Sequence, residues 1–154
     1  MNTPTLGYHA VSSLPKTEIA RVQLTEAINL FVSEKFLCAL TLAGAAEEIL
    51  GRLAVMRGQP STTQAAAAKI LELKDKLGLA ALSSTSEKSL FRSWNAARNI
   101  AKHHNGSDPD PVVMNTCDEA YWMIRRALAN ARLISLNVNN AQDFENWVIM
   151  NVNL

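Results

Sequence analysis

The feature that most constrains the fold of this chain is an uncharged, almost entirely apolar segment at residues 36–46. Its apolar side chains do not alternate with polar ones, as they do in a half-buried strand, and they cover nearly every side of a helix. The segment is too short to span a bilayer, and Glu47 and Glu48 follow it directly. We therefore predict a central, buried helix over residues 36–57, about 33 Å long at about 1.5 Å per residue.

Other segments carry the spacing of three and four between apolar residues that is typical of amphipathic helices. The clearest is residues 17–34, although residues 18–24 also alternate and are compatible with an extended start. Of the 154 residues, 48% are hydrophobic but only 6% are aromatic, which argues against a β-sandwich or barrel. The predicted fold class is all-α: an antiparallel helical bundle of about five main helices plus a short C-terminal helix. The remaining helices are predicted over residues 62–77, 85–105 and 117–136, and after residue 140.

Capping boxes, in which an N-cap hydroxyl is followed three residues later by Glu or Gln, predict where helices begin. They are Ser61 with Gln64, Ser84 with Glu87, and Thr116 with Glu119. The side chains expected to face the core repeat at helical spacing: Ile70, Leu73 and Leu77; Leu90, Phe91, Trp94, Ala97 and Ile100; Ala120, Ile124, Leu128 and Ala131; and Phe144, Trp147, Val148 and Met150. For Trp147 a dimer contact is the alternative to the core.

The N-terminal segment and the cysteines bear on domain organisation and compartment. Residues 1–16 contain several Pro, Gly and Ser residues and are predicted to form an irregular arm, with His9 on its surface, before a single domain over residues 17–154. The arm has no basic stretch and no apolar run, so no secretory signal is predicted. Cys38 and Cys117 lie in apolar helical contexts, which favours small buried thiols over a disulfide. A soluble, cytoplasmic protein without membrane association is the expectation.

A polar cluster near the end of the predicted fourth helix is the strongest candidate site. It contains Arg98, Asn99, His103 and His104, in a chain whose formal net charge is +1. Arginine offers a fork of N–H donors that suits phosphate, and imidazole exchanges a proton near neutral pH. Because the overall charge provides no attraction for nucleic acid, RNA binding would depend on a local patch of this kind.

The geometry of this cluster depends on the helix that carries it. On an ideal helix that continues to residue 105, Asn99 and His103 are about 40° apart, whereas Arg98 and His103 are about 140° apart. Asn99 would then orient His103, and Arg98 would meet a histidine by reaching round the helix or across to a second copy of the protein. In the alternative, Arg98 stacks on Trp94 and the histidines cap helix carbonyls.

Other charged residues allow more than one role. Glu47 either lies at the solvent edge of the central helix or pairs with a basic side chain. Arg125 and Arg126 either contact RNA phosphates or belong to a solvated helix face. Neither a metal nor another cofactor is expected, because the side chains that come closest to a ligand set lack a recognised spacing. These are His103, His104, Asp108 and Asp110.

The segment from Arg98 to His103, with Asn99 second, resembles the R-(polar)-x-x-x-H signature of the HEPN superfamily, the higher eukaryotes and prokaryotes nucleotide-binding domains. Residues 24–50 are similar to that family's first two helices, in which an Ala-Glu pair lies mid-helix, as Ala46 and Glu47 do here. In order and number of helices, the resemblance extends over residues 18–136. The neighbouring His104 fits a looser spacing of the same signature and is the alternative to His103.

The resemblance implies an all-α homodimer that acts as a metal-independent endoribonuclease of toxin–antitoxin, phage-defence or RNA-processing type. By position, Arg98 would stabilise the phosphate, Asn99 would be the polar orienting residue, and His103 would be the acid or base. Glu47 would be a supporting carboxylate near Arg98. RNA is the implied substrate, and an antitoxin or another protein is the implied partner.

Three basic residues, Lys102, Arg125 and Arg126, are candidate RNA contacts around that site. Two other functions remain open at this level. One is a catalytically silent helical module of the same fold that binds a partner protein or a nucleotide. The other is an unrelated helical bundle in which the polar cluster is structural.

Overall fold

The computed structural model describes residues 12–78 and 80–152, and 73% of it is helical. No strand occurs among these residues, so the predicted all-α class is confirmed. Residues 1–11, with His9 and most of the predicted arm, lie outside the described part. The helices are α1 (Lys16–Val32), α2 (Phe36–Met56), α3 (Thr62–Leu77), α4 (Glu87–Lys102), α5 (Thr116–Leu133) and α6 (Ala141–Asn151), with a short 3-10 turn, η1 (Ala80–Leu82), between α3 and α4.

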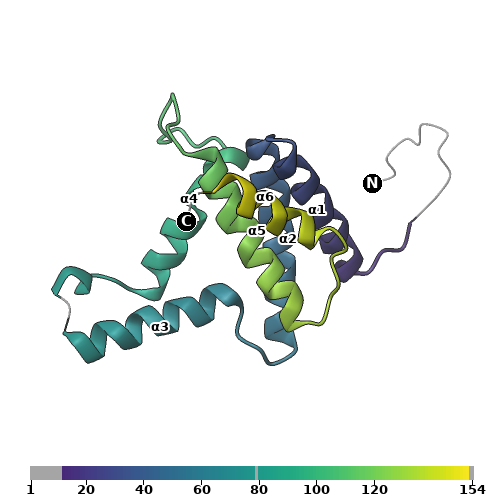
Figure 1. Ribbon diagram of the computed structural model, residues 1–154. Coiled ribbons are helices and arrows are strands. Elements are labelled where there is room, and N and C mark those ends of the chain that lie inside the picture. The colour runs from purple at the N-terminus through teal and green to yellow at the C-terminus, as the bar shows by residue number, and fades with distance from the viewer. Residues whose placement is uncertain (1–11, 79, 153–154) are drawn as a thin grey trace, which may run out of the picture.

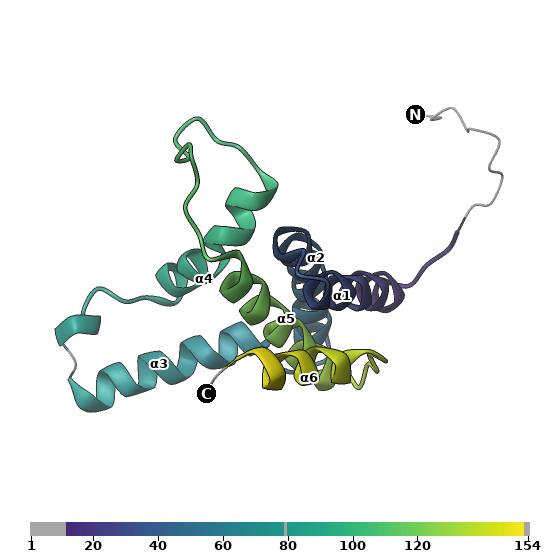
Figure 2. The same ribbon diagram turned by 45° about the horizontal axis from the view of Figure 1, so that its top comes forward.

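The bundle is built around α2, which packs against α1, α4 and α5 (Figure 1). The helices α1 and α2 are antiparallel neighbours. In contrast, α5 runs in the same direction as α2. Their C-terminal ends lie together, where the Arg57 guanidinium just after α2 donates to the carbonyl of Ile134 just after α5. The chain can return in this way because α3 leaves the bundle and α4 leads back to it (Figure 2). The α3–α4 excursion therefore carries the polar cluster of α4 onto the side of α2.

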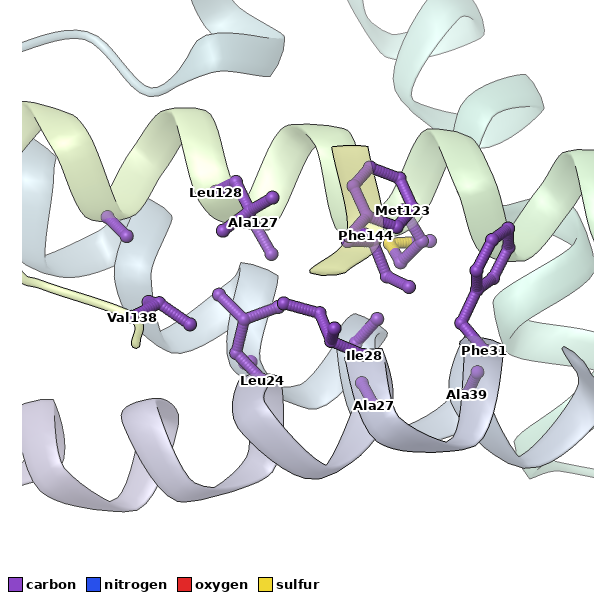
Figure 3. Packing of buried hydrophobic residues seen from close by; sticks show 14 of the residues in the cluster. Leu24, Ala27, Ile28, Phe31, Ala39, Met123, Ala127, Leu128, Val138 and Phe144 are labelled. Atoms are coloured by element: carbon purple, nitrogen blue, oxygen red, sulfur yellow. The ribbon is translucent and has the colours of Figure 1, made fainter. Parts of the chain in front are cut away.

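The hydrophobic core lies between α1, α2, α5 and α6 (Figure 3). Leu24, Ile28 and Phe31 of α1 are fully buried there, and the Phe31 ring packs edge-on against Phe144 at 5.2 Å and Trp147 at 4.7 Å between centroids. The core position predicted for Trp147 is thus confirmed. The small residues that let neighbouring helices approach α2 closely are fully buried: Ala39, Ala43 and Ala46.

One of the three predicted capping boxes is present. The Ser61 hydroxyl accepts from the Gln64 backbone N–H, and the Gln64 side chain accepts from the Ser61 N–H. The box predicted at Ser84 is wrong, because residues 83–85 still belong to the turn that follows η1, and α4 is capped two residues later by Ser86.

The third predicted box, at Thr116, is also wrong. The N-cap of α5 is Asn115, whose side-chain oxygen accepts from the Asp118 N–H and whose amide group donates to the Asp118 carboxylate. At its other end α5 stops at Leu133, earlier than predicted, because Ser135 adopts a φ of 56°. Competition between neighbouring capping side chains therefore moves the starts of α4 and α5 by one or two residues without changing the helices themselves.

Several side chains predicted to be buried are exposed. Leu73 and Leu77 are 49% and 62% exposed, because the outer part of α3 lies beyond the bundle and has no core to face. Met150, near the end of α6, is 75% exposed. The cysteines are free thiols, as predicted, but neither is buried: Cys38 is exposed and Cys117 is half-buried.

In the part of the chain that the structure describes, no helix is both long enough and apolar enough to cross a membrane.

Candidate functional site

The helix that carries the polar cluster ends earlier than its sequence predicts. The last helical residue of α4 is Lys102, and His103 is extended, with φ −133° and ψ 150°, while its N–H still bonds to the Asn99 carbonyl. The chain then turns, because the Asp108 carboxylate accepts from the Asn105 N–H at 2.6 Å. The predicted continuation to residue 105 is therefore wrong, and the ideal-helix angles between His103 and the residues of α4 do not apply.

Both histidines are solvent-exposed at this end of α4, together with Lys102. Neither His103 nor His104 lines the groove that holds Arg98, which is described below. Asn99 does not orient His103 through its side chain. Its Oδ1 instead accepts from the Nε and Nη2 of Arg98, both at 3.4 Å.

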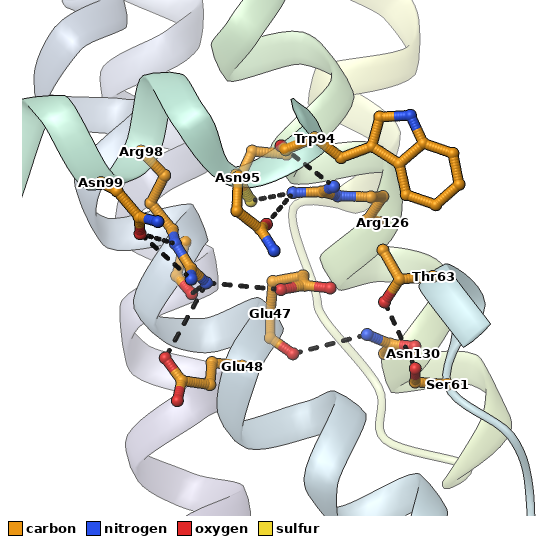
Figure 4. A network of polar contacts seen from close by, with 12 residues as sticks. Glu47, Glu48, Ser61, Thr63, Trp94, Asn95, Arg98, Asn99, Arg126 and Asn130 are labelled. Carbon is orange, nitrogen blue, oxygen red and sulfur yellow. Dashed lines mark hydrogen bonds and ion pairs between the residues drawn. The ribbon is translucent and has the colours of Figure 1, made fainter. Parts of the chain in front are cut away.

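The guanidinium of Arg98 reaches from α4 across to α2 (Figure 4). Its Nη1 lies 3.7 Å from Oε2 of Glu47 and 3.8 Å from Oε2 of Glu48. The Glu47 side chain is only 7% exposed and that of Arg98 only 13%, so the pair is largely removed from water. Of the two roles predicted for Glu47, pairing with a basic side chain is therefore the one observed. Arg98 does not stack on Trp94, because its side chain points away from that ring.

Arg98 can take this path because Gly44 lies opposite it on α2. A Cβ atom at Gly44 would overlap Cδ of Arg98 and lie 2.6 Å from its Cγ. The Gly44 carbonyl also lies 3.5 Å from Nη1 of Arg98. A side chain of any size at this position would therefore force the arginine out of its place between the two helices.

The Arg98–Glu47 pair lies in a groove between α2 and α4, with a volume of about 610 Å³. One end is formed by the start of α3, where Ser61, Thr63 and Gln64 line it. A helix N-terminus carries partial positive charge, although here the N–H groups of Thr62 and Gln64 already donate to Asn130 and Ser61. We name this site the Arg98 groove; its lining residues are Glu47, Glu48, Gly51, Arg52, Val55, Met56, Ser61, Thr63, Gln64, Phe91, Asn95 and Arg98.

Arg126 lies next to this pair and is not a freely solvated residue. Its Nη1 donates to the Trp94 carbonyl at 3.3 Å and its Nη2 to Oδ1 of Asn95 at 3.1 Å, while its Nε is buried without a partner in the described residues. Burial lowers the pKa of this guanidinium, whereas the charge of Glu47 acts to raise it. The positive charge of Arg126 therefore contributes to the electrostatics around Glu47 and Arg98.

Arg125 points to a different part of the molecule. Its Nε donates to the hydroxyl of Tyr121, and its Nη1 pairs with Glu145 of α6 at 2.6 Å. The structure thus brings Arg98, Asn99 and Glu47 together near Arg126. It leaves His103, His104 and Lys102 at the exposed end of α4, and Arg125 beside α6.

The sequence did not single out Asn130, which is fully buried in α5. Its Oδ1 accepts from the Thr62 N–H at 2.8 Å, and its Nδ2 donates to the carbonyl of Glu47 at 3.4 Å. One amide side chain thus joins the start of α3 to the helix that carries Glu47. A signal was available, because an amide at a core-facing position of an amphipathic helix needs buried partners.

Among the described residues, no group of three His, Cys, Asp or Glu side chains is arranged to hold a metal ion. Comparison of the chain with protein-family models, curated proteins and solved structures finds no match.

Proposed function

We propose that the protein is a dimeric, metal-independent endoribonuclease of HEPN type, acting as a toxin, in defence or in RNA processing. The observation that carries this proposal is the state of Arg98. Its guanidinium is held by Glu47, Glu48, Asn99 and the Gly44 carbonyl. An arginine has five N–H groups, and Nη2 has a single acceptor among the described residues, Oδ1 of Asn99, so Arg98 is positioned and still has a donor for a substrate.

The surroundings of Arg98 suit an RNA phosphate. The start of α3 closes one end of the Arg98 groove, and Arg52, with a side chain 78% exposed, lies at its edge. Glu48 is 44% exposed and can move into solvent, while the buried Glu47 keeps Arg98 in place. A phosphate would therefore replace the Glu48 carboxylate beside Arg98 and leave the buried Arg98–Glu47 pair intact.

The proposed reaction uses the ribose as nucleophile. The 2′-oxygen bonds to phosphorus as the bond from phosphorus to the 5′-oxygen breaks, which leaves a 2′,3′-cyclic phosphate and a 5′-hydroxyl. A histidine takes the 2′-hydroxyl proton while water protonates the leaving oxygen, or water takes that proton while the histidine protonates the leaving oxygen. Arg98 stabilises the additional negative charge on the phosphoryl oxygens. Because His103 and His104 lie outside the groove of their own chain, we assign this proton transfer to a histidine from the second copy in the dimer.

The test is cleavage of mixed RNA by purified protein in the presence of EDTA. We expect cleavage by the wild type, loss of at least about a hundredfold in Arg98→Ala, and a similar loss in His103→Ala or His104→Ala, whichever is the proton carrier. Arg92→Ala is the matched control, because Arg92 is exposed on the same helix and does not line the Arg98 groove. Cleavage that persists equally in Arg98→Ala would contradict the assigned role.

A second function is favoured by two observations: neither histidine lies in the groove, and Arg98 is already paired with carboxylates. This arrangement suits a catalytically silent module of the same fold that binds a partner protein, such as an antitoxin, or a nucleotide. Absence of RNA cleavage by a protein that is dimeric and folded would favour this module over the nuclease.

A further inference from the structure

A second cavity, of about 550 Å³, lies on the other side of Arg126, where α4 and α5 meet the start of α3. We name it the indole pocket, because two of the three tryptophans in the chain line it. Its lining residues are Thr62, Thr63, Ala66, Ser93, Trp94, Glu119, Trp122 and Arg126. The indole pocket takes no part in the reaction proposed above.

The composition of the indole pocket is that of a site for a planar, polar ligand. Trp122 is 62% exposed, an uncommon state for the side chain with the largest apolar surface, and Trp94 is half-buried. Glu119 and Arg126 add a carboxylate and a guanidinium to the same walls. Flat aromatic surfaces next to hydrogen-bonding groups of both kinds match a nucleobase, which stacks by its face and is read at its edge.

The indole pocket and the Arg98 groove are neighbours. Thr63 lines both, and Asn95 of the groove accepts a hydrogen bond at 3.1 Å from Arg126 of the pocket. Figure 4 shows Arg98 and the Trp94 ring on opposite sides of Asn95 and Arg126. One strand can therefore place a phosphate at Arg98 and an adjoining base in the indole pocket.

We propose that the indole pocket binds an unpaired guanine of the RNA whose phosphate occupies the Arg98 groove, an inference that rests on the ribonuclease proposed above. Guanine presents two adjacent donors, N1–H and the 2-amino group, to a single carboxylate, and Glu119 is the carboxylate in the pocket. Arg126 lines the same pocket, and Nη1, which donates one of its two N–H groups to the Trp94 carbonyl, has a second one for the guanine O6. Adenine, cytosine and uracil each lack this pair of donors, so the pocket selects against them.

The test measures binding of GMP, AMP, CMP and UMP to the wild-type protein by calorimetry. GMP binds most tightly, and Trp122→Ala or Glu119→Gln weakens GMP binding about tenfold, the size expected for one stacked base or one charged acceptor. Ile149→Ala is the matched control, because Ile149 is 73% exposed on α6, away from both cavities, and it leaves GMP binding unchanged. Equal affinity for all four nucleotides, or GMP binding that neither variant alters, overturns the inference.

An RNA cleavage assay distinguishes the proposed guanine pocket from the proposed nuclease activity. If both are correct, the wild type cuts next to guanines, and Glu119→Gln distributes the cuts more evenly among the bases. Cleavage without base preference, together with equal nucleotide binding, overturns the guanine pocket and leaves the nuclease intact. Selective GMP binding that depends on Trp122 and Glu119, in a protein that leaves RNA uncut, supports the pocket and contradicts the nuclease.

Discussion

Arg98 and Glu47 form an ion pair, at 3.7 Å between Nη1 and Oε2, that joins α4 to the middle of the central helix. Both side chains are nearly buried, and Arg126 adds a second positive charge nearby. A largely buried pair of this kind is costly to break from one side, because the remaining charge keeps its desolvation cost and loses its partner. This relationship determines which variants disturb the groove and which do not.

Glu47→Gln should destabilise the protein by about 1–2 kcal/mol in urea unfolding, less than for a fully buried pair because Glu48 remains near Arg98. Glu48→Gln is the control. Its side chain is 44% exposed, so its loss should change the free energy of unfolding by less than about 0.5 kcal/mol. Equal effects of the two variants would contradict the assignment of Glu47 as the structural partner.

Gly44→Ala should displace Arg98 and destabilise the fold by about 1–3 kcal/mol, because the added methyl group overlaps the arginine side chain. The cost should shrink when Arg98 is already alanine, so a double-mutant cycle in thermal unfolding measures the coupling. Gly106→Ala is the control, since nothing lies within 4 Å of a Cβ there. Additive effects of Gly44→Ala and Arg98→Ala would show that this contact does not matter.

Asn130→Ala should cost about 2–3 kcal/mol of unfolding free energy, because it leaves the partly buried Thr62 N–H and the buried Glu47 carbonyl without their side-chain partner. It should also loosen the start of α3, which hydrogen exchange at Thr62 reports directly. Asn137→Ala, at an exposed position, should be nearly neutral. Unchanged exchange at Thr62 would contradict the proposed link between α5 and α3.

Mixing Arg98→Ala with His103→Ala tests whether the active site is shared between two chains. In a mixed dimer one of the two shared sites retains both Arg98 and His103, so a fully exchanged equal mixture should recover about a quarter of wild-type cleavage. If His104 is the proton carrier, only the mixture with His104→Ala shows this recovery. No recovery with either histidine variant, despite subunit exchange, would contradict a shared site.

The two thiols should differ in reactivity. Cys38 is exposed, whereas burial raises the pKa of the half-buried Cys117, with the charges of Asp118 and Glu34 adding to the effect. A raised pKa means less thiolate at a given pH, so iodoacetamide at pH near 8 should label Cys38 before Cys117, as followed by mass spectrometry. Labelling of Cys117 first would mean that its surroundings open in solution.

Local sequence signals predicted a large part of the architecture. The apolar segment at residues 36–46 correctly indicated the central helix, and Ser61 with Gln64 correctly marked the start of α3. Ser84 and Thr116 show the limit of such signals, because a nearby Ser86 or Asn115 competes for the same cap. Where two residues offer similar local bonds, the path of the surrounding chain selects one of them.

The candidate site was only partly predictable, because its contacts join helices that are far apart in the sequence. The sequence predicted Arg98 and Asn99 as candidate site residues, and the family resemblance implied that Glu47 lies near Arg98. The exposure of Leu73 was not predictable, because an apolar stripe gives no information on whether a partner helix covers it. Asn130 was missed although its core-facing position signals a need for buried partners, because those partners, the Thr62 N–H and the Glu47 carbonyl, are remote in the sequence.

The sequence by itself determined the helical class, the central helix and the residues from which a site can be built, because periodicity and composition act within a few turns of chain. Only the tertiary structure decided that Arg98 points at Glu47 past Gly44, that His103 lies beyond the end of α4, and that Arg126 separates two cavities. These relations join different helices, or depend on how the chain turns between them. They are set by side-chain packing and by the burial of oppositely charged side chains from different helices. No local sequence pattern encodes either of these.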